Sequence, residues 1–173
     1  MEKIVRLRAI EPEDLELLYL IENDVQLWNV GASNVPYSRY VLHDYIANTA
    51  SDIYTDKQLR LIVENHGGEV VGIADLVNFD PRNLRAEVGI VIIDKYRNHG
   101  YGTATLTQLI DYATNILNIH QLYSVIPCSN EKSVSLFSKL GFKESTVLKD
   151  WLSISSKFVD AVLMTKIIGR HRL

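Results

Sequence analysis

Cysteine is nearly absent from this 173-residue sequence, in which Cys128 stands alone. A single thiol excludes an intrachain disulfide and a zinc site built from several thiolates, and it fits a reducing compartment such as the cytoplasm. Long apolar runs are missing as well. No stretch approaches the roughly 18 apolar residues that a membrane-spanning helix needs, and the N-terminal residues lack the apolar segment of a signal peptide. We therefore expect a cytoplasmic protein that does not enter a membrane.

An excess of positive charge is also lacking, because 18 Lys and Arg residues face 21 Asp and Glu residues, and the formal net charge is −3. Such a chain has no general attraction to nucleic acids. No repeat, low-complexity tract or Pro/Gly/Ser-rich linker divides the sequence. Because 47% of the residues are apolar, a chain of this length can bury one continuous core. We expect one domain that spans residues 1–173.

The spacing of apolar residues predicts a succession of strands and helices. Alternation with period two indicates strands, whereas apolar residues three and four positions apart indicate helices with one buried face. The predicted strands cover about residues 5–9, 59–64, 69–79, 87–93, 122–127, 142–152 and 158–168, and the predicted helices begin near residues 12, 38, 102 and 130. The predicted order is β-α-α-β-β-β-α-β-α-β-β.

A glycine-punctuated junction between an apolar strand and a helix is the most informative local feature. Residues 87–93 form the strand, Gly100 and Gly102 punctuate the turn, and the helix follows directly. The start of a helix leaves about four backbone N–H groups without intrahelical partners and carries partial positive charge, so it holds phosphate well. The junction therefore predicts a pyrophosphate cradle. A dinucleotide fingerprint is excluded by Thr105, which stands where a third glycine is needed, and no Gly-Lys-Ser/Thr of a P-loop is present.

The junction and the segments after it resemble the GNAT superfamily of acyl-CoA-dependent N-acetyltransferases. The resemblance rests on Arg97-x-x-Gly100-x-Gly102 after a strand, then on Asn130-Glu131-Lys132-Ser133 and Lys139-Leu140-Gly141-Phe142. It covers about residues 5–166 and looks most like the branch of spermidine, ribosomal-protein and amino-group acetyltransferases. It implies an α/β (α+β) fold, in which a single, mostly antiparallel mixed sheet is splayed at its centre and flanked by helices.

The resemblance also implies acetyl-CoA as co-substrate and no required metal. The backbone of Ile90, Val91 and Ile92 would pair with the pantetheine arm in the manner of an added strand. Asn130 and Ser133 would contact the CoA arm beyond the thioester, although from the residues alone Asn130 could cap a helix and Ser133 could be a surface residue. The residues that would wrap the pyrophosphate are Arg97, Asn98, His99, Gly100, Tyr101, Gly102 and Thr103.

In this superfamily the substrate amine attacks the thioester directly in a ternary complex. A base must accept the proton of the amine, and a donor must stabilise the developing oxyanion. The expected oxyanion donor is the Val91 N–H. Asp75 and Glu87 are the candidate bases, because each is an acid within an otherwise apolar strand and must be paired or wet.

Each candidate base has an alternative explanation. Asp75 could form a structural ion pair with Arg60 or Arg85, and Glu87 could be a solvated strand end or a dimer contact. The alternation of the strand places Asp75 on one face together with Val71, Ile73, Val77 and Phe79.

Phe137 stands where the spermidine-type pattern carries a tyrosine that protonates the departing thiolate. Because a thiol has a pKa near 8.5, the thiolate is a tolerable leaving group without that acid. The departure is compatible with another donor, such as Tyr123, Ser133 or solvent. It is equally compatible with a chain that binds acyl-CoA without turning it over.

The acceptor region also departs from the spermidine-type pattern. Residues 29–35 contain no carboxylate, and Asn78 occupies another position that is acidic in that branch, so the case for a polyamine is weakened. Trp28 and Tyr37 could line the substrate mouth or merely hold the loop.

The sequence predicts an N-acetyltransferase that transfers acetyl from acetyl-CoA to a primary amine of a small molecule, a polyamine or a protein N-terminus. The alternative is a regulatory or catalytically weak module that binds acyl-CoA. No nucleic-acid or membrane partner is expected. The edges of the last two strands could support a homodimer.

Overall fold

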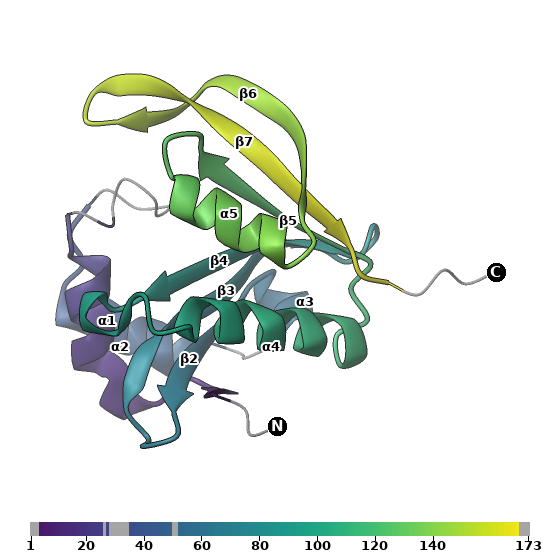
Figure 1. Ribbon diagram of the computed structural model, residues 1–173. Helices are drawn as coiled ribbons and strands as arrows, with labels where there is room; N and C mark the ends of the chain where they lie inside the picture. Colours follow the sequence, from purple (N-terminus) through teal and green to yellow (C-terminus); the bar gives the residue numbers. More distant parts are fainter. Residues whose placement is uncertain (1–3, 26, 28–34, 50–51, 170–173) are drawn as a thin grey trace.

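A seven-stranded sheet forms the centre of the protein in the computed structural model, which describes residues 4–25, 27, 35–49 and 52–169 (Figure 1). The strands lie in the order β1-β2-β3-β4-β5-β7-β6. β4 and β5 run parallel, and every other neighbouring pair is antiparallel. The strands are β1 (Val5–Arg8), β2 (Leu59–Asn65), β3 (Val70–Asp80), β4 (Arg85–Ile92), β5 (Gln121–Pro127), β6 (Lys143–Ile154) and β7 (Lys157–Ile167).

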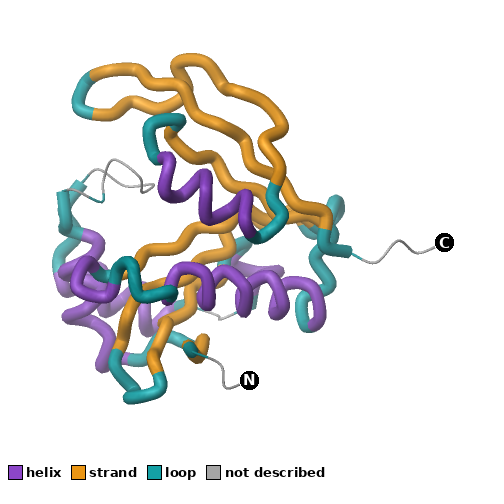
Figure 2. The backbone as a smooth tube through the Cα atoms, viewed as in Figure 1, coloured by secondary structure: helices purple, strands orange, loops and turns teal. Residues whose placement is uncertain are grey.

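Helices cover both faces of this sheet (Figure 1, Figure 2). α4 (Tyr101–Asn115) and α5 (Glu131–Lys139) pack on one face, whereas α1 (Leu15–Glu22) and α2 (Arg39–Asn48) pack on the other. Short 3-10 turns precede α1 at Pro12–Asp14 and α4 at Asp94–Tyr96. The mostly antiparallel mixed sheet with flanking helices, expected from the resemblance, is confirmed.

One short helix was not predicted from the sequence. α3 (Ile53–Asp56) is a single turn that begins at Asp52, whose carboxylate accepts hydrogen bonds from the backbone N–H groups of Tyr54 and Thr55. Such a cap stabilises a helix start by about 1 kcal/mol. Apart from α3, the elements follow the predicted order.

Two apolar clusters attach the helices to the sheet. Leu18 of α1 and Leu42 of α2 are buried against Ile62 and Ile73 in the smaller cluster. The larger cluster lies under α4 and α5 and includes Leu106, Leu109, Leu122, Phe137 and Met164. Burial of each such side chain contributes about 1.5–3 kcal/mol, so these clusters determine which face each helix covers.

The sheet is splayed between its two central strands. β4 and β5 pair only where Arg85, Ala86 and Glu87 face Gln121, Leu122 and Tyr123. Beyond Glu87 the strands separate, so residues 88–92 of β4 have no strand partner on that side within the described part of the chain. The splay that the resemblance implies is therefore present, and its apex lies at the Glu87–Tyr123 pair.

Two irregularities in β3 change which faces its side chains reach. The register with β2 shifts around Val71, and the register with β4 shifts between Val77 and Asp80. Asn78, inside the second shift, has the left-handed φ of 52°. The expectation that Val71 and Phe79 share a face with Ile73 is therefore wrong, because both belong to the larger cluster and Ile73 belongs to the smaller one. Each extra residue in a strand turns the following side chains over.

Candidate active site

The predicted phosphate cradle lies where the turn after β4 enters α4. Gly100 is the N-cap residue of α4, and its φ of 84° is a conformation that residues with a Cβ rarely adopt. No side chain caps this helix start. The first backbone N–H groups of α4 therefore point out of the helix without intrahelical acceptors, as an anion site requires.

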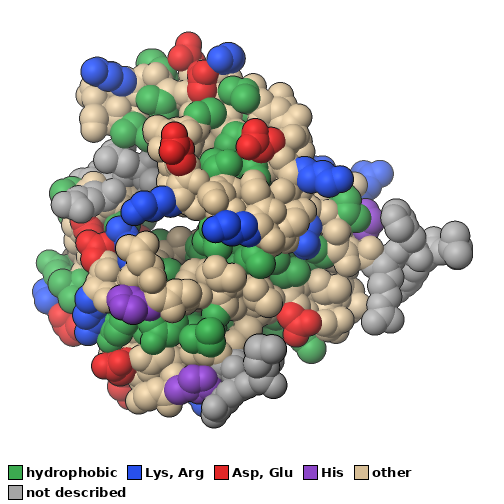
Figure 3. All heavy atoms as spheres, in the orientation of Figure 1, with side chains coloured by type: hydrophobic (Ala, Val, Ile, Leu, Met, Phe, Trp, Pro, Cys, Tyr) green, Lys and Arg blue, Asp and Glu red, His purple; other side chains and the backbone are tan. Residues whose placement is uncertain are grey.

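Arg97 braces the turn against the end of β4. Its Nε donates to the carbonyl oxygen of Ile92 at 3.0 Å, and its Nη1 lies 2.7 Å from the Asp94 carboxylate. The guanidinium remains about half exposed. Several arginine and lysine side chains lie, together with some acidic ones, on the face of the molecule that carries α4 and α5 (Figure 3). Of the seven residues expected to wrap the pyrophosphate, Arg97 to Gly100 form this turn and Tyr101, Gly102 and Thr103 are the first three residues of α4.

The open edge of β4 begins next to the cradle. Ile90, Val91 and Ile92 form the end of the strand, directly before the turn that Arg97 braces. Alternate residues of a strand direct their backbone groups to opposite sides. Because the Ile93 N–H donates to the Val71 carbonyl of β3, Val91 also faces β3, whereas Ile90 and Ile92 face the side where β5 has separated. An extended arm could pair with these two residues as a further strand would. The structure thus brings together the cradle and the strand that the sequence assigned to the cofactor.

Asn130 has the capping role that the sequence left open. Its side-chain oxygen accepts the backbone N–H of Ser133 at 3.2 Å, at the start of α5. Both residues are half-buried. The cap fixes the start of α5 across the splay from β4, and contact of Asn130 and Ser133 with CoA stays a prediction.

A polar group occupies the apex of the splay. Glu87 faces Val77 of β3 and Tyr123 of β5. Its Oε2 accepts a hydrogen bond of 2.8 Å from the side-chain amide of Asn78. Burial raises the pKa of Tyr123, the Glu87 carboxylate raises it further, and a hydrogen bond from Asn78 acts in the opposite direction. Tyr123 therefore stays a neutral hydroxyl at pH 7.

Asp75 is held by an arginine. Arg60 donates to both of its carboxylate oxygens, at 2.8 and 2.9 Å, and also forms an ion pair with Glu22 of α1. Burial alone would lower the pKa of Arg60, but the Asp75 and Glu22 carboxylates hold it well above its usual value. The ion pair with Arg60 that the sequence offered as an alternative for Asp75 is thus present, while Arg85 pairs with Asp80 instead.

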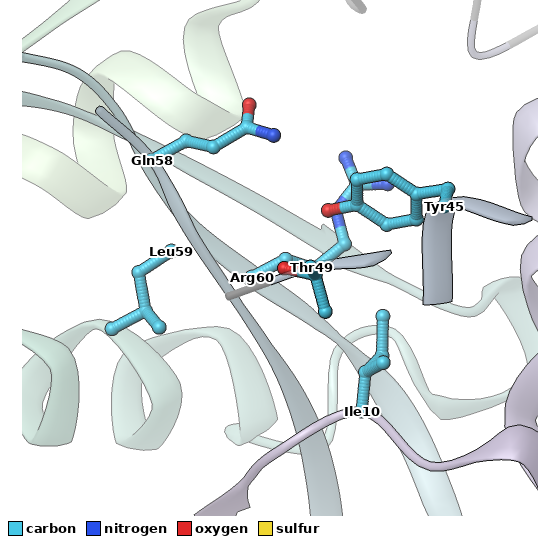
Figure 4. A pocket seen from close by; sticks show the side chains of 6 residues that line it. All are labelled: Ile10, Tyr45, Thr49, Gln58, Leu59 and Arg60. Atoms are coloured by element: carbon cyan, nitrogen blue, oxygen red, sulfur yellow. The ribbon is translucent and has the colours of Figure 1, made fainter. Parts of the chain in front are cut away.

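The side chain of Tyr45 lies beside Arg60 at a small pocket (Figure 4). Burial raises the pKa of Tyr45, so its hydroxyl is neutral and covers the arginine from α2. The other residues that line the pocket are Ile10, Thr49, Gln58 and Leu59.

The sheet face under α1 and α2 carries an excess of negative charge near the splay. Arg60, Asp75 and Glu87 share this face, because Arg60 pairs with Asp75 and Glu87 pairs with Val77, two positions along β3. Glu22 of α1 joins them through Arg60. Three carboxylates and one guanidinium give these four side chains a formal charge of −2, which would attract an ammonium group.

The aromatic residues singled out from the sequence have separate positions. Phe137 is buried and stacks edge to face on Phe142, with ring centroids 4.9 Å apart, so no hydroxyl is present at that place. Tyr37 packs against the smaller cluster, and its backbone N–H and carbonyl both bond to the Asn23 side chain, at 2.8 and 3.0 Å. A position of Tyr37 at the substrate mouth stays a prediction. Trp28 lies outside the described residues.

Sequence reasoning missed the role of Asn78, which was noted only as the absence of an acid. The contact of Asn78 with Glu87 depends on the β3 irregularity, which a period-two pattern does not reveal. The only local signal is the residue type, since asparagine tolerates a left-handed backbone.

Within the described ranges, no group of three or more His, Cys, Asp or Glu side chains is placed to hold a metal ion. None of the described helices is long and apolar enough to cross a membrane.

Comparison with known families gives a match over most of the chain. The model of a family described as an acetyltransferase (GNAT) domain matches residues 5–143. The chain is 29% identical over 164 residues to spermidine N(1)-acetyltransferase of Escherichia coli strain K12, which covers 92% of this chain and 84% of that protein. It is 28% identical over 141 residues to an N-alpha-acetyltransferase of Sulfurisphaera tokodaii, with 76% and 77% covered.

A solved structure has the same fold. The crystal structure of spermidine N-acetyltransferase from Vibrio cholerae in complex with CoA and spermine matches with a TM-score of 0.85. The two chains are 23% identical, and the match covers 96% of this chain and 97% of that one.

Proposed function

Because the chain belongs to the GNAT acetyltransferase family, which transfers acetyl groups from acetyl-CoA to amines, we propose that its acceptor is a small polycation with a primary amino group, such as spermidine. The observation that carries this proposal is the excess of two negative charges among Glu22, Asp75, Glu87 and Arg60. A protein N-terminus offers one ammonium group, whereas a polyamine offers several. The carboxylates missing from residues 29–35 are thus supplied by α1, β3 and β4.

The described residues fit acetyl-CoA as the second substrate. The start of α4 and the Arg97 turn would hold its phosphates, and the open edge of β4 would hold its pantetheine arm. With the phosphates at the end of β4, the arm runs back along the strand. The acetyl group would then lie toward the apex, near Glu87 and Tyr123.

We assign the role of base to Glu87 rather than to Asp75. Both oxygens of Asp75 are occupied by Arg60, whereas Glu87 is bound by the neutral amide of Asn78. A primary amine with a pKa near 10.4 is mostly ammonium at neutral pH, so it must lose a proton before it attacks. Glu87 would take that proton, directly or through a water molecule.

The amine nitrogen then bonds to the acetyl carbon, and the carbonyl electrons move onto its oxygen. The Val91 N–H expected as the donor faces β3, so a backbone N–H of the open edge, at Ile90 or Ile92, would donate to that oxygen instead. As the carbon–sulfur bond breaks, the nitrogen gives its second proton to water and the electron pair leaves with sulfur. The thiolate takes a proton either directly from water or from Tyr123, which water then reprotonates. The products are an acetylated amine and CoA. Tyr123 is the donor we favour, because its neutral hydroxyl lies at the apex and Phe137 has none.

The proposal is tested by the release of CoA thiol with acetyl-CoA and three kinds of amine: spermidine, a monoamine and a peptide with a free N-terminus. We expect the highest kcat/KM with spermidine. Glu87→Gln should lower kcat by about 10²- to 10⁴-fold, and Glu144→Gln, an exposed carboxylate of β6, is the control. A higher kcat/KM with the peptide than with spermidine would contradict the proposal that the acceptor is a polycation. Tight CoA binding by calorimetry without thiol release from any amine would favour the regulatory acyl-CoA-binding module.

A further inference from the structure

We propose that Asn78 is a positioning residue for acetyl transfer, which an irregularity in β3 turns toward Glu87 so that its amide orients the carboxylate of the base. This inference rests on the proposed function, because it takes Glu87 as the group that receives the proton of the amine. Three observations carry it: the backbone of Asn78, the way the irregularity is held, and the pattern of hydrogen bonds at Glu87.

The backbone of Asn78 redirects its side chain. Val77 is the register partner of Glu87, so their side chains share a face of the sheet. In a regular strand the next residue points to the opposite face. Asn78 instead has a φ of 52°, and its amide reaches Glu87 Oε2 at 2.8 Å. Strand irregularities next to active sites commonly re-aim a side chain in this way.

The irregularity does not depend on the Asn78 side chain. The backbone N–H of Phe79 leaves the ladder and donates to the carbonyl oxygen of Lys57 at 2.9 Å. The ring of Phe79 is buried and stacks edge to face on Tyr54, with centroids 5.2 Å apart. These contacts hold the strand in its irregular form. A variant that removes only the Asn78 amide should therefore keep the fold.

The hydrogen bonds at Glu87 suit a base. Asn78 donates to Oε2, and among the described residues no group donates to Oε1. One oxygen is thus fixed in orientation and the other can receive a proton. An arginine in place of Asn78 would occupy both oxygens and favour the charged form, as Arg60 does at Asp75. A neutral amide orients the carboxylate without that effect.

Several ionisable groups surround Glu87. Tyr123 faces it from β5, and Arg85 lies on its own strand, paired with Asp80. Asp75 lies on β3, two residues before Val77, the register partner of Glu87. It is held by Arg60 of β2, which also pairs with Glu22 of α1. Tyr123 also interacts with the Asn78 side chain, so an effect through Tyr123 must be separated from one through Glu87, and the Glu87→Gln background does this. The other groups keep their partners when only residue 78 is altered.

Two substitutions separate the amide from the backbone. Asn78→Gly keeps a residue that accepts the left-handed φ and removes the amide. Asn78→Asp keeps the shape and places a second carboxylate beside Glu87. The matched control is Asn118→Gly, since Asn118 is exposed, has a φ of 53° and lies in the turn after α4.

We expect Asn78→Gly to lower kcat by about 10-fold with an unchanged KM for acetyl-CoA, because small misplacements of a reacting group cost rate rather than binding. Asn78→Asp places a second carboxylate beside Glu87, which disfavours its charged form, so the acidic limb of the kcat/KM profile should move to higher pH. In a Glu87→Gln background, Asn78→Gly should cause no further loss, because the two residues act as one unit.

Equal kcat and an equal pH profile in wild type and Asn78→Gly would overturn the inference, as would a full additional loss in the Glu87→Gln background. The titration of the Glu87 carboxyl carbon by NMR in unliganded protein gives a readout that needs no turnover. An Asn78→Asp titration identical to wild type overturns the inference alone. A wild type that acetylates no amine overturns the proposed function, whatever the titration gives.

Discussion

Thr105 of α4 carries the only buried side-chain oxygen among the described residues that has no hydrogen-bond partner. The residue is fully buried in the first half of the helix, at the position where a dinucleotide fingerprint would need glycine. A buried hydroxyl without a partner is destabilising, because it has lost its hydrogen bonds to water and has formed none within the protein.

We expect Thr105→Val to raise the free energy of unfolding by about 1 kcal/mol, since valine keeps the branched shape and removes the hydroxyl. Urea denaturation followed by circular dichroism measures the change. The control is Thr107→Val, whose exposed hydroxyl donates to the Thr103 carbonyl at 2.8 Å. If Thr105→Val were less stable than wild type, the Thr105 hydroxyl would have a hydrogen-bond partner, and the expectation would be wrong.

Asp14 gives a stability contribution that depends on pH. Its carboxylate is buried and accepts two hydrogen bonds from Arg8, at 2.7 and 2.9 Å, and one from the Glu11 N–H at 2.8 Å. Burial acts to raise the pKa of Asp14, but the hydrogen bond from Arg8, that from Glu11 and the charge of Arg8 together lower it below 3.8. The stabilisation is thus present above the unfolded-state pKa and is lost as the pH falls through the folded-state pKa.

We expect Asp14→Asn to lower the free energy of unfolding by about 2–3 kcal/mol at pH 7. The gap to wild type should shrink as the pH falls below 3.8, where wild type loses the same charge. Denaturation curves between pH 7 and pH 3 measure it. The control is Glu16→Gln, at an exposed pair with Arg39, which should change stability less. A gap that stayed constant with pH would contradict the assignment to the ion pair.

The two candidate bases show how far residue-level prediction reached. An acid in an apolar strand needs a partner, and of the two that the sequence offered for Asp75, Arg60 and Arg85, Arg60 forms the ion pair. It could not choose between Asp75 and Glu87, because the choice depends on which partner each carboxylate has. That Asn78 bonds to Glu87 follows from a single left-handed residue, and no spacing rule encodes it.

At the scale of elements, the start of α4 is the cradle that the sequence placed first. A Cβ at Gly102 would lie 3.4 Å from Leu136 of α5 and 3.9 Å from Ile92 of β4, which are ordinary contacts. The residue therefore faces the gap between β4 and α5, along the path proposed for the CoA arm. A larger side chain fits the protein but narrows this path.

We expect Gly102→Val to weaken CoA binding by at least about 10-fold, measured by calorimetry, while the melting temperature changes by only a few degrees. Gly102→Ala should have an intermediate effect. Gly67→Ala, in the turn between β2 and β3, is the control. An affinity unchanged in Gly102→Val would refute the proposed path of the arm.

The order of elements could be predicted because each strand and helix carries its own periodicity and punctuation. α3 could not, since four residues are too few to show a helical period, and only Asp52 marks its start. The irregularities of β3 could not be predicted for a similar reason. One inserted residue shifts the alternation of buried and exposed side chains, but no particular residue type in the sequence marks its position. The splay came from the resemblance alone, since no residue tells where parallel pairing stops.

At the scale of the whole molecule, the hairpin of β6 and β7 extends beyond the rest of the sheet (Figure 1). Its exposed apolar side chains include Val147, Trp151 and Phe158, and 72% of the Phe158 surface is accessible. Exposed apolar groups on an edge strand commonly mark contacts between proteins. The homodimer expected from the sequence stays a prediction, and the hairpin is where it would form.

We expect sedimentation to give a dimer for wild type and a monomer for Phe158→Asp, because a charge in an apolar contact is costly. Binding of CoA should be retained, since Phe158 lies on the C-terminal hairpin, away from the cradle at α4. His66→Asp, in the exposed turn between β2 and β3, is the control. A monomeric wild type would contradict the dimer.

Because β4 and β5 pair over a short seam only, the bound co-substrate would take the place of a strand in the sheet during each reaction cycle. Four strands lie on one side of the seam and three on the other, and only three residue pairs join them. On the proposed function, acetyl-CoA binds in the splay between β4 and β5 in each turnover, and CoA then leaves it. Release of CoA would therefore require its strand-like hydrogen bonds with β4 to break. The turnover rate would then depend on the rate of this release as well as on the rate of acetyl transfer.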